Sequence, residues 1–121
     1  MALQESGEMY LESIALLKET KGFVRAIDVC EYMGFSKPSV SRAMGLLRDG
    51  GYITISRVGG IELTELGAEV ARKIYERHVL LTSILKAIGV SDTVASEDAC
   101  KIEHVISDET FEKLKEYFNK K

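Results

Sequence analysis

The sequence predicts a mostly α-helical fold with a small β wing: an N-terminal winged helix-turn-helix followed by a helical dimerisation domain. Two short helical patterns over residues 24–49 are separated by a turn that contains Gly34. Two short β-rich runs come directly after them, as the wing of a winged helix does. A long helical pattern then begins near Thr64, and two more helices complete the chain.

The first helix is predicted over "GEMYLESIALLKETKG". Tyr10, Ile14 and Leu17 form one apolar stripe at helical spacing, with Leu11 beside it. Gly22 is expected to end the helix. This stripe is typical of a helix that packs one face on a core.

The helix before Gly34 is short, and the pattern indicates that its inward side chains are Ile27, Cys30, Tyr32 and Met33.

The helix after Gly34 has clear start and stop signals. Ser36 is a good N-cap, and Pro38 falls in the first turn, where proline is tolerated. Its buried face is expected to consist of side chains at i, i+4 and i+7, namely Val40, Met44 and Leu47. The helix would expose polar and basic residues near its start, namely Lys37, Ser39, Ser41 and Arg42.

The wing is predicted as a hairpin around "RVGG", which contains Arg57. Its two runs contain β-favouring residues, namely Tyr52, Ile53, Ile55, Ile61 and Leu63. The long helix that follows keeps helical spacing over about six turns through Leu66, Val70, Ile74, Leu81, Leu85 and Ile88. We therefore expect residues 1–66 to form the winged domain and residues 67–121 the helical domain.

Two further helices are predicted after Gly89, with Ser91 and Ser107 as their N-caps. In the last helix Phe111, Leu114 and Phe118 have the spacing of a dimer seam, although the same spacing would suit the core of a single chain.

Composition limits the class of protein. With 121 residues, 45% hydrophobic and 29% charged, the chain is long enough for a compact core. The longest run without a charged residue, 78–85, is too short to cross a membrane, and no secretory signal is expected at the N-terminus. Two cysteines do not make a disulfide framework, which favours a reducing cytoplasmic location.

The net charge of −3 conceals an uneven distribution. Residues 21–60 contain six basic and three acidic side chains, a net charge of +3, and acidic segments flank them. A basic middle segment is what a surface that faces phosphate groups requires.

The stretch "ACKIEHV" contains a thiol, a carboxylate and an imidazole at Cys100, Glu103 and His104. Residues three and four apart lie on one helix face, so these side chains would converge. Mixed S, O and N donors suit a divalent transition metal. Ordinary packing is the alternative. Cysteine nucleophile chemistry is disfavoured because no glycine nest or strand-turn-helix elbow precedes Cys100, so we expect no enzyme.

Three other side chains are candidates for the same site. His78 lies on the inward face of the long helix, between Ile74 and Leu81, where a hydrogen-bonded core histidine is the alternative. Met9 and Glu12 share one side of the first helix, where packing and solvation are the respective alternatives.

Five motifs, in this order, resemble the diphtheria toxin repressor and manganese transport regulator family: "EMYLESI", "SKPSVSRAMGLLRDGGYI", "GGIELTELG", "RHVLL" and "EDACKIEHVISDE". The resemblance runs along nearly the whole chain, and the last motif is the most specific. It implies a winged helix that binds DNA, a helical domain that dimerises, and a divalent metal between them that permits operator binding. The chain corresponds to the shorter members, which lack an SH3-like domain.

The resemblance also implies a ligand set. The primary site of the iron-responsive branch falls on Met9, Cys100, Glu103 and His104, and a second or paired metal position falls on His78. The manganese-responsive branch has acids at the positions of Met9 and Cys100 and a glutamate at that of Glu12, so this sequence is mixed. Sulfur donors favour Fe²⁺ over Mn²⁺, with Co²⁺, Ni²⁺ and Zn²⁺ as further candidates.

The expected function is a metal-dependent, iron-responsive repressor that binds palindromic double-stranded operator DNA as a homodimer. Side chains expected at the DNA are Arg25, Ser36, Lys37, Pro38, Ser39, Ser41, Arg42 and Arg57. The alternatives are a manganese-responsive regulator of the same family and a metal-independent winged-helix dimer.

Overall fold

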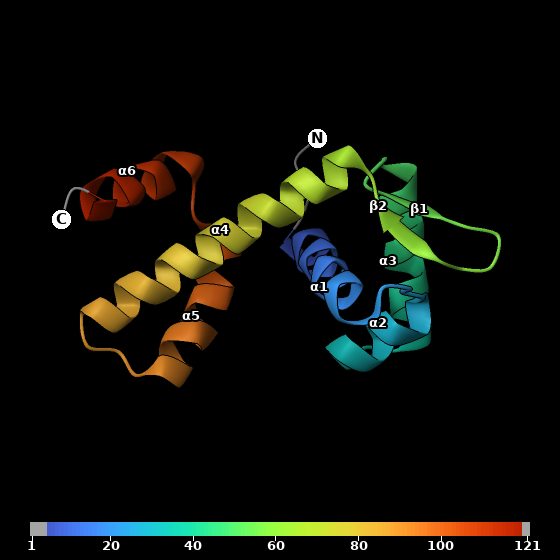
Figure 1. The fold of residues 1–121 in the computed structure, drawn as a ribbon, viewed down its shortest axis with the longest axis horizontal. Coiled ribbons are helices and arrows are strands. Elements are labelled where there is room, and N and C mark those ends of the chain that lie inside the picture. The colour runs from blue at the N-terminus through green and yellow to red at the C-terminus, as the bar shows by residue number, and fades with distance from the viewer. Residues whose placement is uncertain (1–4, 120–121) are drawn as a thin grey trace. The chain divides into compact units, whose positions relative to one another are not determined.

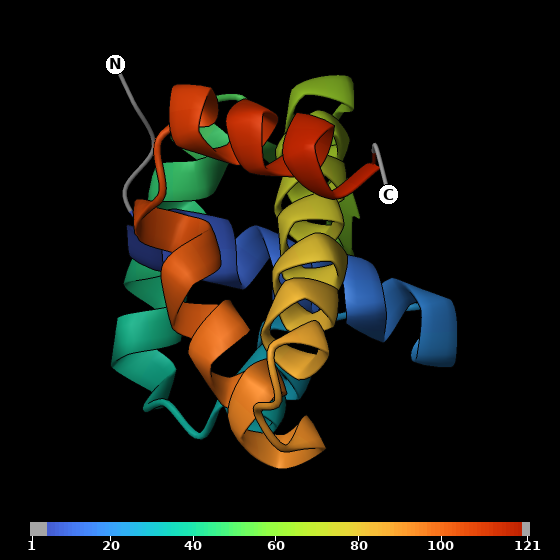
Figure 2. The same ribbon diagram turned by 90° about the vertical axis from the view of Figure 1, so that its left-hand side faces the viewer.

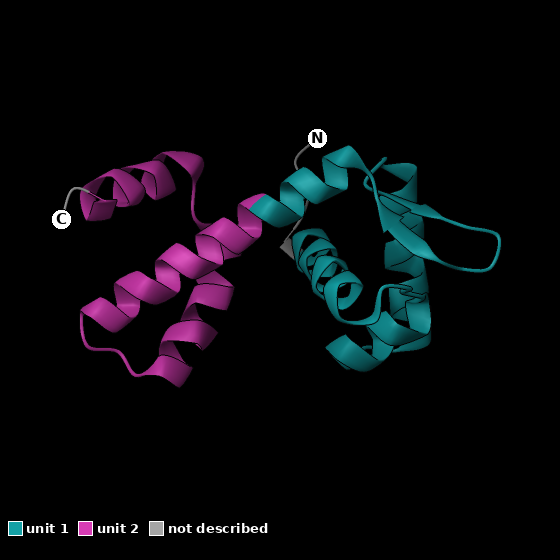
Figure 3. Cartoon of the chain, viewed as in Figure 1, with its two compact units in different colours: residues 1–72 teal, residues 73–121 magenta. Residues whose placement is uncertain are grey.

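The structure, a computed structural model, describes residues 5–119 and contains six helices and one two-stranded sheet in that range (Figure 1). The chain divides into two compact units, residues 1–72 and residues 73–121 (Figure 3). A mostly helical fold with a small β wing is therefore confirmed. The predicted domain division between residues 66 and 67 stays a prediction.

Unit 1 contains three helices and the wing: α1 (Glu5–Lys21), α2 (Ala26–Met33), α3 (Lys37–Asp49), β1 (Ile53–Ile55) and β2 (Ile61–Leu63). The strands pair antiparallel, with Thr54 opposite Glu62. Helix α1 packs on α2, α3 and β2, and α3 packs on β1. This is the arrangement of a winged helix-turn-helix.

The core of unit 1 consists largely of side chains that the sequence pattern predicted. Those of α1 and α3 are buried as expected, namely Tyr10, Leu11, Ile14, Leu17, Val40, Met44 and Leu47. The prediction for α2 was partly wrong, because Ile27 and Tyr32 are 42% and 54% exposed. Cys30 is buried as predicted, and Met33 packs partly against the same core, whereas the buried Val29 was not predicted.

Local signals account for the helix ends. The carboxylate of Asp28 accepts a hydrogen bond from the backbone N–H of Arg25 (2.9 Å), which begins α2. Gly34 ends that helix in the left-handed conformation, with φ of 72°. The Ser36 hydroxyl accepts from the Ser39 N–H (3.3 Å), as predicted for the N-cap of α3.

The junction between the wing and α4 (Glu65–Ala87) is compact. Thr64 Oγ1 donates to the Gly51 carbonyl (2.6 Å) and accepts from the Gly67 N–H (3.1 Å). Gly67 is buried, and a Cβ atom added there would lie 2.0 Å from the Tyr52 carbonyl oxygen. Only glycine permits this close approach.

Unit 2 contains the rest of α4 with α5 (Asp92–Val105) and α6 (Asp108–Asn119). Helix α5 returns beside α4 after a short turn, and α6 starts where α5 ends (Figure 2). The buried apolar side chains of this unit are Ile74, Leu81, Ala95, Ala99 and Phe111.

The ends of these helices agree only in part with the predicted patterns. Ser107 caps α6 by accepting from the Thr110 N–H (3.1 Å), whereas Ser91 occupies the N-cap position of α5 without a side-chain cap. Leu66 and Ile88, at the two ends of the predicted stripe of α4, are 50% and 68% exposed. Phe111 is buried, and the predicted seam through α6 stays a prediction.

None of the helices in the described range, residues 5–119, has the length and apolar character needed to cross a membrane.

Candidate metal centre and DNA-binding surface

Two elements of unit 2, α4 and α5, bring a carboxylate and two imidazoles together. Glu103 is fully buried, and its Oε1 atom lies 2.7 Å from Nδ1 of His78. Its Oε2 atom lies 3.4 Å from Nε2 of His104, whose side chain is 1% exposed. These three predicted site residues therefore converge within one unit.

The sequence produces this convergence locally. Glu103 and His104 occupy the last turn of α5, and His78 lies near the middle of α4, one turn after the buried Ile74. The small Ala95 and Ala99, at i and i+4 on α5, are also buried, which places them on one face of this helix. The His78 side chain remains 26% exposed, so solvent reaches the site on its side.

Cys100 lies one turn before Glu103 on the same helix, and its side chain is exposed. It is therefore not part of the buried apolar core of unit 2. The other cysteine, Cys30, is buried in unit 1 and belongs to the hydrophobic core there.

Met9 and Glu12 are both half-buried residues of α1, in unit 1. They are three residues apart, which places them on one side of the helix. The Met9 carbonyl accepts a hydrogen bond from the Ser13 hydroxyl (2.9 Å), one turn further along α1. Their part in a metal site stays a prediction.

The donor set in unit 2 fits a divalent transition metal. One carboxylate and two imidazoles are ligands that Fe²⁺, Mn²⁺ and Zn²⁺ all accept. A fully buried carboxylate needs compensating partners, because an isolated charge is strongly disfavoured away from water. A bound cation would provide that compensation.

The sequence interpretation missed Arg77. Its side chain is only 7% exposed, and Nη1 donates to the backbone carbonyls of Glu103 (3.1 Å) and Ile106 (2.9 Å). Nη2 donates to the carboxylate of Asp108. The available signal was its spacing, since Arg77 lies three residues after Ile74 and four before Leu81, both buried.

Asp108 has two cationic neighbours. The Nζ atom of Lys73 lies 2.9 Å from its Oδ1 atom, and this hydrogen-bonded ammonium is the main reason that the pKa of Asp108 is lowered. Arg77 contributes in the same direction.

The predicted DNA-contacting side chains lie on the surface of unit 1. Four of them, Lys37, Pro38, Ser41 and Arg42, are exposed on α3. The hydroxyls of Ser36 and Ser39 are hydrogen-bonded to each other (2.9 Å) at the start of the same helix. Arg57 is exposed in the turn between β1 and β2.

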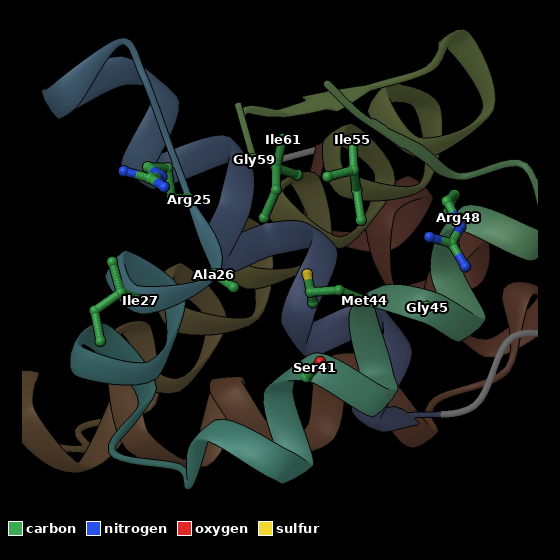
Figure 4. A pocket seen from close by; sticks show the side chains of 10 residues that line it. All are labelled: Arg25, Ala26, Ile27, Ser41, Met44, Gly45, Arg48, Ile55, Gly59 and Ile61. Carbon is green, nitrogen blue, oxygen red and sulfur yellow. The ribbon is translucent and has the colours of Figure 1, made fainter. Parts of the chain in front are cut away.

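A hollow of about 520 Å³ lies between α2, α3 and the wing (Figure 4). Its floor is apolar and includes Met44, Ile55 and Ile61, and its charged lining residues are Arg25 and Arg48. Arg25 lies against the wing, since a Cβ atom added at Gly59 would lie 3.4 Å from its Nε atom. Arg48 was not among the predicted contacts.

A winged helix-turn-helix joined to a helical unit with a buried carboxylate–imidazole cluster is the arrangement expected of a metal-responsive DNA-binding regulator. Comparisons with known proteins agree. The family described as "Iron dependent repressor, N-terminal DNA binding domain" matches residues 2–61. The family described as "Iron dependent repressor, metal binding and dimerisation domain" matches residues 64–120.

Similar proteins include an uncharacterised HTH-type transcriptional regulator of Methanocaldococcus jannaschii, 34% identical over 98% of this chain and 96% of that protein. The HTH-type transcriptional regulator MntR of Shouchella clausii is 35% identical over 90% of this chain and 76% of its own length. Among solved structures, the manganese regulator SloR superposes with a TM-score of 0.80 and 26% identity, over 98% of this chain and 55% of that chain.

The chain belongs to the diphtheria toxin repressor and manganese transport regulator family of metal-dependent transcriptional repressors. These proteins are regulators and not enzymes, so that prediction is confirmed.

Proposed function

We propose that this chain is an iron-responsive repressor that binds palindromic operator DNA as a homodimer in the cytoplasm when a divalent metal is bound. The observation that carries the proposal is the convergence of His78, Glu103 and His104 in the unit that follows the winged helix. A chain that joins both parts can link occupancy by metal to binding of DNA.

Four side chains would hold the primary ion, namely Met9, Cys100, Glu103 and His104, with His78 and Glu12 at a second or paired position. Bound there, the ion would supply positive charge between donors from α1 and α5. Glu103 would neutralise that charge, and His78 would orient the carboxylate through its hydrogen bond. Because Met9 and Glu12 belong to α1, this ligand set would couple the winged helix to the helical unit.

Coupling of this kind is reciprocal. If metal and operator DNA favour the same conformation of the dimer, each tightens binding of the other by the same factor. Two winged helices held at a fixed separation would place two copies of α3 in successive major grooves.

On the DNA side, Lys37, Arg42 and Arg57 would contact phosphates, and Pro38, Ser39 and Ser41 would lie near base edges. The hollow between α3 and the wing has two arginines and an apolar floor, which suits the sugar–phosphate backbone of one strand. We therefore add Arg48 to Arg25 as a phosphate contact. Ser36 would act mainly as the cap that fixes the start of α3.

The choice of iron rests on Met9 and Cys100, whose sulfur atoms favour Fe²⁺ over Mn²⁺. Manganese is the second candidate. It is favoured by the similarity to the manganese regulator SloR and by the four oxygen and nitrogen donors of Glu12, His78, Glu103 and His104.

An anaerobic titration tests the function. Binding to a palindromic promoter fragment is followed while Fe²⁺ or Mn²⁺ is added, and the proposal expects DNA binding to rise steeply with Fe²⁺. DNA binding that is indifferent to any metal would establish the metal-independent alternative. His104→Ala should abolish tight metal binding while the helical content is retained, and unchanged metal affinity would show that the ligands are wrong.

A further inference from the structure

We propose that Arg77 is a positioning residue of the metal centre, which holds the last turn of α5 so that Glu103 and His104 keep their donor atoms in place. The inference rests on the proposed function, since it concerns the same site. Arg77 would not be a ligand itself, because a guanidinium stays protonated.

The first observation is that Arg77 is a buried charge with several specific partners. Its side chain is 7% exposed, and the guanidinium is hydrogen-bonded to two backbone carbonyls and one carboxylate. Removing a charged group from water is unfavourable unless such partners replace the water. The planar fork of an arginine reaches three acceptors at once, which a lysine ammonium on a flexible stem does not reproduce.

The second observation is where those acceptors lie. The last carbonyls of a helix have no partner within it, and α5 ends without a left-handed glycine cap, since Ile106 is extended with ψ of 138°. Arg77 donates to the carbonyls of Glu103 and Ile106 and so closes this end of the helix. A cation at a helix C-terminus is also favourable for the helix dipole.

The third observation is that consecutive residues of α4 hold Glu103 at two points. His78 contacts the Glu103 side chain at 2.7 Å, and Arg77 contacts its main-chain carbonyl at 3.1 Å. A residue held by both main chain and side chain has little freedom to turn. Because His104 follows Glu103 directly in the chain, the contacts that fix Glu103 also restrict the backbone of His104.

The fourth observation is that Arg77 also contacts the first turn of α6. Asp108, the first residue of α6, accepts from Arg77, and the Phe111 ring centroid lies 5.5 Å from Cζ of Arg77. The turn that separates α5 from α6 is thereby fixed to α4 on both of its sides.

A purely structural role for Arg77 predicts a loss of stability and nothing more. A positioning role predicts, in addition, a change at the metal. Replacing residues that support ligands typically lowers metal affinity by about 10–100-fold. The two roles are therefore separated by measuring metal affinity in a variant that remains folded.

The experiment uses the full chain with Arg77→Lys, and Lys115→Gln as the matched control. Lys115 Nζ makes an ion pair with Glu76 Oε2 (2.9 Å), so the control disturbs another contact between α4 and α6. Both variants and the wild type are titrated anaerobically with Co²⁺, with the ligand-field and thiolate absorption bands as readout. Amide hydrogen exchange of the metal-free proteins is measured over residues 100–111.

The expected result is that Arg77→Lys binds Co²⁺ about 10–100-fold more weakly than the wild type, with altered bands and faster exchange at residues 103–108. Lys115→Gln should keep the wild-type affinity and bands. Equal Co²⁺ affinity and bands in Arg77→Lys and wild type would overturn the inference. If the wild type itself binds no Co²⁺, the proposed function fails instead.

A second variant covers the case in which Arg77→Lys does not fold. Asp108→Asn keeps Arg77 but removes the charge that anchors its Nη2 atom. A weaker change in the same direction is expected, and wild-type Co²⁺ affinity and wild-type exchange together would contradict the positioning role.

Discussion

The Nδ1 atom of His78 and the Oε1 atom of Glu103 lie 2.7 Å apart and join the middle of α4 to the last turn of α5. Glu103 is fully buried, whereas the His78 side chain is 26% exposed. The partly exposed ring thus supports a fully buried carboxylate.

Replacing His78 should weaken the metal-free protein. His78→Ala removes the ring that supports the buried Glu103 carboxylate, so we expect the free energy of unfolding to fall by about 1–3 kcal/mol. Urea denaturation of the metal-free protein at fixed protein concentration measures the change. Ser83→Ala, an exposed change on the same helix, should stay within about 0.5 kcal/mol. Equal stability of the two variants would show that the hydrogen bond contributes little.

Cys100 should decide which metal the protein prefers. Cys100→Asp exchanges a sulfur donor for an oxygen donor, so the affinity ratio of Fe²⁺ to Mn²⁺ should fall. Because the side chain is exposed, unfolding stability should change by no more than about 0.5 kcal/mol. Competition titrations with both metals measure the ratio. A ratio that does not move would mean that the thiol is not a ligand.

The hollow between α3 and the wing should contribute to the salt dependence of DNA binding. If Arg25 and Arg48 each neutralise one phosphate, each alanine variant should reduce the slope of log K against log salt by about one. Fluorescence anisotropy with metal-saturated protein at several salt concentrations gives the slope. Lys101→Ala, which removes an exposed charge from α5, is the control and should leave it unchanged. An unchanged slope in both arginine variants would show that the residues of the hollow do not contact DNA phosphates.

Two helical glycines should respond to alanine in opposite directions. In Gly67→Ala the new methyl group would lie 2.0 Å from the Tyr52 carbonyl oxygen, so we expect a loss of about 1–3 kcal/mol or more. In Gly45→Ala the nearest side-chain atom is 4.0 Å away, at Arg48, so we expect a gain of about 0.5–1 kcal/mol. Thermal denaturation of both variants checks the signs. A stable Gly67→Ala protein would mean that the junction between the wing and α4 can move apart.

Asp108 should make stability depend on pH in the acid range. The hydrogen-bonded Lys73, together with Arg77, lowers the pKa of Asp108 in the folded protein, so the folded state favours the ionised carboxylate. This contribution is complete above the ordinary carboxyl pKa of about 4 and is lost as the pH falls through the lower folded value. Asp108→Asn should therefore be less stable than the wild type at neutral pH, and the difference should shrink on acidification. Denaturation from pH 7 to pH 2.5 measures it, and a constant difference would contradict the ion pair.

Sequence patterns were sufficient for the apolar stripes of α1 and α3 and for the start of α3 and the end of α2. The stripes of α1 and α3 are buried as predicted, and Ser36, Pro38 and Gly34 lie where the start and stop rules placed them. These features depend on spacing and backbone conformation, both of which are local properties of the chain.

The patterns failed where tertiary packing decided the outcome. In the eight-residue α2, several phases of the apolar stripe are compatible with the sequence, and packing against α1 and α3 selects Val29 over Ile27 and Tyr32. Arg77 was missed because arginine is normally exposed. Its partners, Glu103 and Asp108, come from segments 26 and 31 residues away, which local spacing does not identify.

The contrast between the two cysteines has a practical consequence for chemistry at the site. Cys30 is shielded in the core of unit 1, whereas Cys100 is open to reagents in solution. A maleimide therefore labels the folded chain first at Cys100, and the rate of that alkylation becomes a direct assay of whether the thiolate is engaged. From the same difference in exposure we expect peroxide to oxidise Cys100 before Cys30.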